Sequence, residues 1–210
     1  MTSRLEADEI SEPFEKIGER LRDERVRAEL SQRELARRVG LSASMISQLE
    51  SGLSKPSVGT LWAIVTELDV SLDQVIRGEE ADTGDRRGPP QSNISPLVRP
   101  ADRQAIELDS GVKWEQLVAV AERDVDFIHA DYEVGGSSTP DESLMRHEGR
   151  EYGYVISGTL SIKIDFEEYE LQAGDSIAFD STRPHRLFNK GDVPVKSIWF
   201  VVGRGADSRR

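Results

Sequence analysis

Residues 31–52 carry the pattern that most constrains the fold, two short helix-forming stretches separated by a glycine. Ser31-Gln32-Arg33-Glu34 is a capping box, in which the serine hydroxyl accepts a hydrogen bond from the N–H three residues on and the glutamate reaches back. That helix is expected to end at Val39, because Gly40 suits the left-handed residue that terminates a helix. Ser42 can cap the next helix. The sequence therefore predicts two short helices joined by a sharp turn.

Three further helices are expected around this pair. The first runs from about Pro13 to Ala28, with an apolar face at Phe14, Ile17 and Leu21. Ser57 can cap a fourth helix, and a second capping box at Ser71 opens a fifth that stops near Gly78. The residues expected to pack the central pair are Leu35, Ala36, Val39, Leu41, Ile46 and Leu49. We thus expect an all-α, five-helix bundle over residues 13–78.

The small–Gly–apolar spacing over positions 32–51 resembles the phage-repressor (Xre-type) helix-turn-helix family. The residues that carry the resemblance are Ser31-Gln32-Arg33-Glu34-Leu35-Ala36, Gly40-Leu41-Ser42, Ile46-Ser47, Glu50-Ser51-Gly52 and Lys55-Pro56-Ser57. The resemblance implies double-stranded DNA as the partner, with the third helix entering the major groove by its N-terminus. The alternative is a helical protein-binding domain whose polar positions are merely exposed.

Eight residues are candidates for contacting DNA. Gln can bond adenine in bidentate fashion, Ser is permissive, and Ala can touch a thymine methyl. Gln32, Lys55 and Arg37 are expected at phosphates, Gln32 with help from a helix N-terminus. The complete candidate set is Gln32, Arg37, Ser42, Ala43, Ser44, Ser47, Gln48 and Lys55.

The composition limits the other possibilities. A chain of 210 residues is long enough for two domains. The absence of cysteine excludes disulfides and thiolate metal sites and suits a cytoplasmic protein. No apolar run approaches a membrane span, so no membrane partner is expected. The net charge of −12 argues by itself against nucleic acid, but between Lys16 and Lys55 the balance is slightly positive.

The rest of the chain divides into an arm, a linker and a β domain. Residues 1–12 are expected to be a flexible arm, and residues 79–99 a linker rich in Gly, Pro and charge. Period-two patterns over residues 100–205 predict the strands Trp114–Val120, Val125–Glu133, Glu151–Ile156, Thr159–Phe166, Ser176–Phe179 and Val195–Val202. Ser157-Gly158 is predicted to be a hairpin turn, and residues 198–202 a central or interface strand.

Two motifs in the β domain resemble those of the cupin family. The first is matched at His147, Glu151 and Gly158, and the second at Gly174-Asp175, His185 and Asn189. The resemblance covers residues 125–202 and implies an all-β jelly-roll barrel of six to eight strands. The chain departs from the family at Met145, where a further histidine is usual, and at Asp180 and Thr182, which replace a proline and a glycine.

His147, Glu151 and His185 form a two-histidine, one-carboxylate set. Such a set can hold a divalent metal such as Zn, Fe, Ni or Mn with open positions. The alternative is a vestigial pocket whose histidines are hydrogen-bonded and hold no metal. The residues expected to line or rim a small-effector pocket are Arg146, Arg150, Tyr152, Tyr154, Arg183, His185 and Trp199, with ordinary sheet-surface packing as the alternative.

Together the two domains predict a homodimeric, ligand-responsive transcriptional regulator of a pseudo-palindromic operator. The effector would be an unidentified small molecule bound by the cupin domain. An alternative is a mononuclear non-haem iron oxygenase or epoxidase that uses the His–Glu–His set, because the layout is similar to that of the fosfomycin-forming epoxidase. A third hypothesis is a protein-interaction module.

Overall fold

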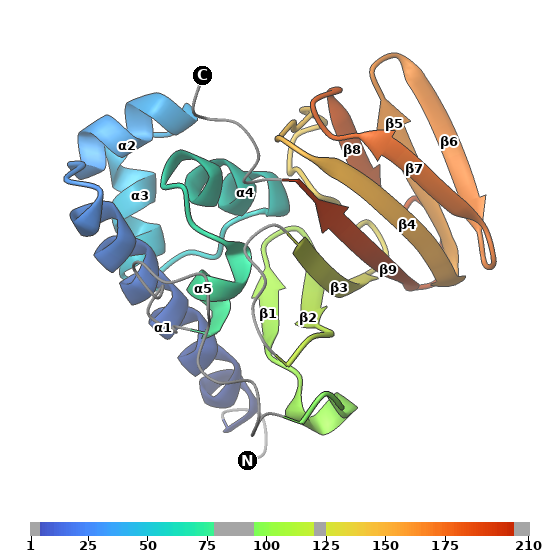
Figure 1. The fold of residues 1–210 in the computed structure, drawn as a ribbon, viewed down its shortest axis with the longest axis horizontal. Helices are drawn as coiled ribbons and strands as arrows, with labels where there is room; N and C mark the ends of the chain where they lie inside the picture. Colours follow the sequence, from blue (N-terminus) through green and yellow to red (C-terminus); the bar gives the residue numbers. More distant parts are fainter. Residues whose placement is uncertain (1–4, 78–94, 120–124, 204–210) are drawn as a thin grey trace.

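The computed structural model describes residues 5–77, 95–119 and 125–203, with helices on one side and β-sheets on the other (Figure 1). The helices are α1 (Leu5–Arg27), α2 (Gln32–Val39), α3 (Ala43–Glu50), α4 (Val58–Glu67) and α5 (Leu72–Arg77), and a 3₁₀ turn spans Pro100–Asp102. None of the described helices combines the length and apolar character needed to cross a membrane. Residues 1–4 of the expected arm and residues 79–94 of the expected linker lie outside the described residues.

The predicted serine caps are confirmed, whereas the Glu34 carboxylate, which was expected to reach back to the cap, accepts from Arg37 and Arg38. The hydroxyls of Ser31, Ser42, Ser57 and Ser71 each accept from the backbone N–H three residues on. Gly40 ends α2 with a φ of +73°, in the left-handed region that favours glycine. The start of α1 differs from expectation, since the helix begins at Leu5 rather than Pro13. Residues 5–12 combine good helix formers with charged ones, and we had taken their polarity for an arm.

The predicted core of the helical domain is also present. Leu35, Ala36, Ile46 and Leu49 are buried, and Val39 and Leu41 pack against them while half-buried. Ile17 and Leu21 of α1 cover this core from one side. Gly18 lies so close to α3 that an added Cβ would come within 2.4 Å of the Leu49 carbonyl oxygen. This packing leaves the opposite face of α3 to solvent.

The described β residues form nine strands in two antiparallel sheets. One sheet has the order β1-β2-β3-β9-β4-β7 and the other β6-β5-β8. The strands are β1 (Ala105–Leu108), β2 (Val112–Gln116), β3 (Val125–Tyr132), β4 (Arg150–Ser157), β5 (Thr159–Ile164), β6 (Glu167–Gln172), β7 (Ser176–Asp180), β8 (His185–Phe188) and β9 (Val195–Val202). The prediction of a central strand at residues 198–202 is confirmed, because β9 lies between β3 and β4.

Two expectations about the strands were wrong. Ser157-Gly158 does not join a hairpin, because β4 and β5 belong to different sheets. Gly158 instead turns the chain from one sheet to the other with a φ of +79°, where an added Cβ would meet the Pro194 carbonyl oxygen at 2.8 Å. The sequence also missed β1, β6 and β8; β6, for example, is exposed at all but one position and so lacks an apolar alternation.

Candidate functional site

The exposed face of α3 is the first candidate site. Ser44, Ser47 and Gln48 are exposed side by side on this helix, as predicted. Ala43 is half-buried and packs against the core, while Met45, which the sequence analysis did not single out, is 38% exposed. The Ser42 hydroxyl accepts from the Met45 N–H and so caps the helix. The face presents two hydroxyls, one amide and one thioether to solvent.

The three expected phosphate-contacting residues all have partners within the protein. Gln32 donates from Nε2 to Oε2 of Glu50 at 2.8 Å. Arg37 pairs with Glu34 at 2.7 Å, and Lys55 pairs with Glu107 of β1 at 2.9 Å. Arg37 and Lys55 would have to exchange these carboxylates for phosphate on DNA. Their role in DNA binding remains a prediction.

The second candidate site is a buried cluster between the two sheets. His147 lies in the loop before β4, Glu151 on β4 and His185 at the start of β8, and all three are buried. Oε1 of Glu151 lies 2.9 Å from Nε2 of His147 and 3.2 Å from Nε2 of His185. One potential ligand atom from each residue lies within 4.8 Å of the others. The fold therefore brings together the three residues that the sequence singled out.

The contacts of the two Nδ1 atoms determine which ring nitrogen carries the hydrogen in His147 and His185. Nδ1 of His147 lies 3.0 Å from the Glu148 carbonyl oxygen, and Nδ1 of His185 lies 2.8 Å from that of Arg183. A carbonyl only accepts, so each Nδ1 carries the hydrogen and a neutral ring presents the Nε2 lone pair. Both Nε2 atoms and the Glu151 Oε1 are buried without a hydrogen-bond partner. Three lone pairs that converge in this way need either a proton or a cation between them.

The cluster fits a divalent metal ion. Ligand atoms at about 2.1 Å from a metal at right angles to one another lie about 3 Å apart, close to the two short distances observed here. The Nδ1–carbonyl contacts supply the outer hydrogen bonds that orient metal-binding histidines. Met145, which replaces the usual further histidine, is half-buried and pairs with His185 through its backbone. The residues that could hold a metal are thus His147, Glu151 and His185.

The electrostatics of the cluster favour a charged carboxylate. Burial alone would raise the pKa of Glu151, but a proton on Nε2 of His147 or His185 would donate to this carboxylate, and the two histidines together lower its pKa to about 2. Burial would lower the pKa of His185, and the neighbouring carboxylate outweighs that effect and raises it. A carboxylate that stays ionised at neutral pH is what a metal ligand requires.

A cavity of mainly apolar lining lies next to this cluster. The lining residues are Val58, Trp62, Trp114, Ile128, Tyr132, Ser138, Met145, Glu151, Leu187, Trp199 and Val201. The expectation for Trp199 agrees with this lining, and His185 lies just behind it, against Glu151. Gly153 makes room for Trp199, because an added Cβ would lie 2.4 Å from the indole.

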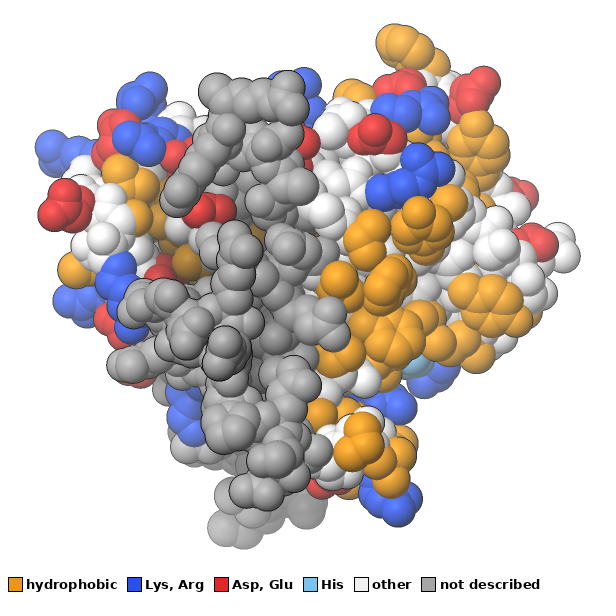
Figure 2. Space-filling view, viewed as in Figure 1, with side chains coloured by type: hydrophobic (Ala, Val, Ile, Leu, Met, Phe, Trp, Pro, Cys, Tyr) orange, Lys and Arg blue, Asp and Glu red, His pale blue; other side chains and the backbone are white. Residues whose placement is uncertain are grey.

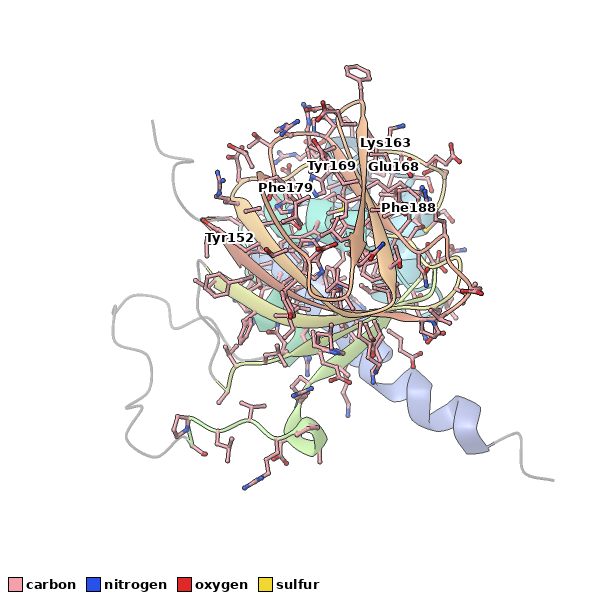
Figure 3. The ribbon with its side chains drawn as sticks, turned by 90° about the vertical axis from the view of Figure 1, so that its right-hand side faces the viewer. Tyr152, Lys163, Glu168, Tyr169, Phe179 and Phe188 are labelled. Carbon is pink, nitrogen blue, oxygen red and sulfur yellow. The ribbon has the colours of Figure 1, made fainter. Side chains whose placement is uncertain are left out.

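The other five residues that were expected to line or rim the pocket are not among its lining residues. Tyr152 and Tyr154 alternate with Glu151 on β4 and therefore point outward, where they are 44% and 48% exposed. Figure 3 shows Tyr152 directed away from the interior. Arg146 and Arg150 are exposed, and Arg183 is exposed and pairs with Asp165 at 2.7 Å. The inward set could not be chosen before the strand register was known.

Helix α4 closes the cavity from the helical side. Val58 and Trp62 of this helix belong to the lining, and Figure 1 shows α4 between the other helices and the sheets. The Trp62 ring stacks on the His147 ring with centroids 4.5 Å apart and planes at 11°. The sequence analysis missed both residues, because their positions read only as the apolar face of a helix. No local signal relates them to His147.

Comparisons with known proteins agree with the division of the chain into a helical domain and a β domain. Residues 21–75 match the helix-turn-helix family model and residues 128–201 match the cupin domain model. The HTH-type transcriptional regulator PuuR of Escherichia coli is 28% identical over 82% of this chain and 86% of its own length. The regulator SutR of the same organism is 27% identical over 77% of this chain and 80% of its own.

A solved HTH_3 family transcriptional regulator from Vibrio cholerae has the same fold, with a TM-score of 0.66 and 22% identity over 92% of this chain and 98% of its own. The protein is therefore a helix-turn-helix domain followed by a cupin domain. PuuR and SutR, whose similarity extends over the two domains, are transcriptional regulators.

Proposed function

We propose that this protein is a DNA-binding transcriptional regulator whose cupin domain binds a small-molecule effector. The exposed polar face of α3, on a helix-turn-helix domain, is the observation that carries the proposal. Ser44, Ser47 and Gln48 lie where base edges would be read, and the similarity to PuuR spans both domains. In this proposal the DNA site and the effector site lie on one chain, in the helix-turn-helix domain and the cupin domain respectively. We expect the protein to act in the cytoplasm.

Binding to DNA is tested by fluorescence anisotropy with the region upstream of the protein's own gene, over a series of salt concentrations. Replacing Gln48 by Ala is expected to cost about 1–3 kcal/mol of specific binding, because one bidentate base contact is lost. The matched control is Gln172→Ala, which removes an exposed glutamine of β6 and should leave the affinity unchanged. Absence of salt-sensitive binding by the unchanged protein, with and without cell extract, would overturn the proposal.

We expect two copies to bind a pseudo-palindromic operator with half-sites about 34 Å apart, one helical turn. An outward face of the larger sheet supports pairing through the cupin domains, because Tyr152, Tyr154, Ile156 and Phe200 are each at least 40% exposed there. Figure 2 shows hydrophobic side chains gathered over this part of the surface. Sedimentation of the unchanged protein and of Tyr154→Ser tests the pairing, and a monomer in both would contradict it.

We further propose that His147, Glu151 and His185 hold a divalent ion of the Zn, Fe, Ni or Mn group. Such an ion would supply positive charge and open coordination positions at the end of the cavity. Elemental analysis of the purified protein, together with mass spectrometry of small molecules released from it, reports ion and effector together. His185→Ala should lose the ion, whereas Asn189→Ala, which changes a buried amide outside the ligand set, should keep it.

A second candidate function is that of an iron-dependent oxygenase. The buried two-histidine, one-carboxylate set favours it, because this is the ligand set of many non-haem iron enzymes. We rank it second because PuuR and SutR, whose similarity spans both domains, are transcriptional regulators. Iron-dependent oxygen uptake with a candidate substrate would support the oxygenase, and a protein purified without metal would argue against it.

A further inference from the structure

The helical domain docks on the cupin domain through the N-terminal turn of α4. The first N–H groups of a helix have no partner within the helix, and Gly59 donates its N–H to the Ser138 carbonyl oxygen at 3.0 Å. Asp109 donates in turn to the Pro56 carbonyl oxygen at 2.9 Å. A side chain at Gly59 would be tight, because its Cβ would lie 3.1 Å from Thr139 Cγ2. This helix turn is thus fitted closely to the cavity wall.

Trp62 places its indole at the end of the cavity nearest the His–Glu–His cluster. The ring is 4% exposed, lies face to face with His147 and meets Trp114 edge to face with centroids 6.0 Å apart. Aromatic rings pack favourably in both arrangements. The indole therefore occupies a position in which a flat molecule would contact the same two rings.

The docked arrangement leaves almost no room for anything else. What remains of the cavity can hold about one water molecule, since one water needs roughly 10–15 Å³ of space open to its centre. An organic effector of even one ring needs more space than this, and withdrawal of the Trp62 side chain would supply it. Docking of α4 and binding of such an effector are consequently alternatives.

We propose that Trp62 is an internal occupant of the effector site, and that the effector is a small, planar, aromatic molecule that competes with it. The planar shape follows from the stacking geometry on His147. Among the described lining residues Glu151 carries the only charge, and the rest of the lining offers uncharged, largely apolar contacts that suit a flat ring. This inference rests on the proposed function, in which the cupin domain binds an effector.

Competition of this kind would carry a signal directly to the DNA-binding domain. Helix α4 contacts α2, which packs against the recognition helix α3. A ligand shifts an equilibrium only if it binds one arrangement better than the other. Here the preference arises because the docked arrangement already fills the site with Trp62. The undocked arrangement would free the helical domain to change its position relative to the cupin domain.

The test uses the full chain and indole as the probe, with binding measured by isothermal titration calorimetry. Trp62→Ala is expected to bind indole at least tenfold more tightly than the unchanged protein, because the competing ring is gone. Trp62→Phe keeps a ring in place and should fall between the two. The matched control is Phe166→Ala, which removes a 99% exposed aromatic ring between β5 and β6 and should bind as the unchanged protein does. Equal affinity in Trp62→Ala and the unchanged protein, or binding by neither, would overturn the proposal.

Hydrogen exchange supplies a second readout that does not need a variant. The amides of Gly59 and Asp109 both donate across the domain boundary, so saturating indole should speed their exchange at least tenfold. The amides of Thr60 and Gln74, which donate to cap hydroxyls within the helical domain, should not change. Indole that binds without speeding exchange at Gly59 would also overturn the proposal. DNA binding by the unchanged protein is measured separately, so failure here is distinguishable from failure of the proposed function.

Discussion

Two buried clusters of charged residues, one in each domain, differ in how their polar atoms are paired. In the helical domain Arg25 donates to both carboxylate oxygens of Glu50, at 2.5 and 2.9 Å, and Gln32 donates to the same group. In the cupin domain the two histidine Nε2 atoms and the Glu151 Oε1 converge without a donor. Burial is similar in the two, so burial alone does not separate a structural cluster from a site.

This difference in pairing indicates which of the two clusters is a candidate binding site. The Arg25–Glu50 cluster is complete, since another Arg25 N–H donates to the Leu30 carbonyl oxygen and thereby ties α1 to the start of α2. A complete cluster stabilises the fold and has no place for a ligand. The His147–Glu151–His185 cluster lacks a positive centre, so it has a reason to bind one. The following changes test this contrast, from the largest expected effect to the smallest.

Replacing Arg25 by Leu should destabilise the protein by about 3–5 kcal/mol, because it leaves the Glu50 carboxylate buried without its charge partner. Urea denaturation followed by circular dichroism measures the loss. The control is Arg27→Leu, whose ion pair with Glu24 involves a 53% exposed arginine and should contribute less than about 1 kcal/mol. Similar losses in the two variants would show that the buried pairing is not what holds α1 to α3.

Replacing Glu151 by Gln should abolish stabilisation by added metal. With zinc at 100 times its dissociation constant the unchanged protein should gain about 2.7 kcal/mol in its free energy of unfolding. The variant should gain nothing, and without metal it should lose less than Arg25→Leu does, because its amide can donate to an imidazole. Denaturation with zinc and with a chelator measures both quantities.

Glu168→Gln is the matched control, since Glu168 is an exposed glutamate that pairs with Lys190. It should keep the full response to zinc. An equal response in Glu151→Gln would place the metal elsewhere and remove the contrast between the two clusters.

Glu34 provides a third case for comparison, because its charge is fully paired, as in the Arg25–Glu50 cluster, but exposed to solvent. Hydrogen bonds from Arg37 and Arg38 lower the pKa of Glu34 to about 2, from 4.5 in its unperturbed form. A lowered pKa stabilises the folded state above pH 4.5, and this contribution disappears as the pH falls toward 2. Glu34→Gln should therefore be slightly less stable than the unchanged protein at pH 6 and equally stable near pH 2. Urea denaturation at several pH values checks this, and a difference that grows toward low pH would contradict it.

Much of the helical domain could be predicted because its signals are local. The serine caps at residues 31, 42, 57 and 71 bond to an N–H three residues away, so neighbouring residues alone define them. The exposed row Ser44, Ser47 and Gln48 follows from helical periodicity once α3 is placed. The start of α1 was missed because the charged residues of its first turns form no apolar stripe.

The metal-binding candidates could be named from spacing, but the pocket could not. Tyr152 and Tyr154 were expected to line or rim the pocket, and the register of β4 with β9 and β7 directs Glu151 inward and them outward. The corner at Gly158 was taken for a hairpin because both uses need a residue with positive φ. These two errors concern how strands are arranged in space.

The helix-turn-helix, its caps and the identities of His147, Glu151 and His185 were determined by the sequence itself, because short-range hydrogen bonds and motif spacing specify them. Only the tertiary structure decided that α4 closes the cavity and that Trp62 stacks on His147. Trp62 lies on a helix whose apolar positions serve equally well in any core, and its partner is distant in the sequence. Such contacts depend on how two domains pack, and nothing local to either residue encodes that.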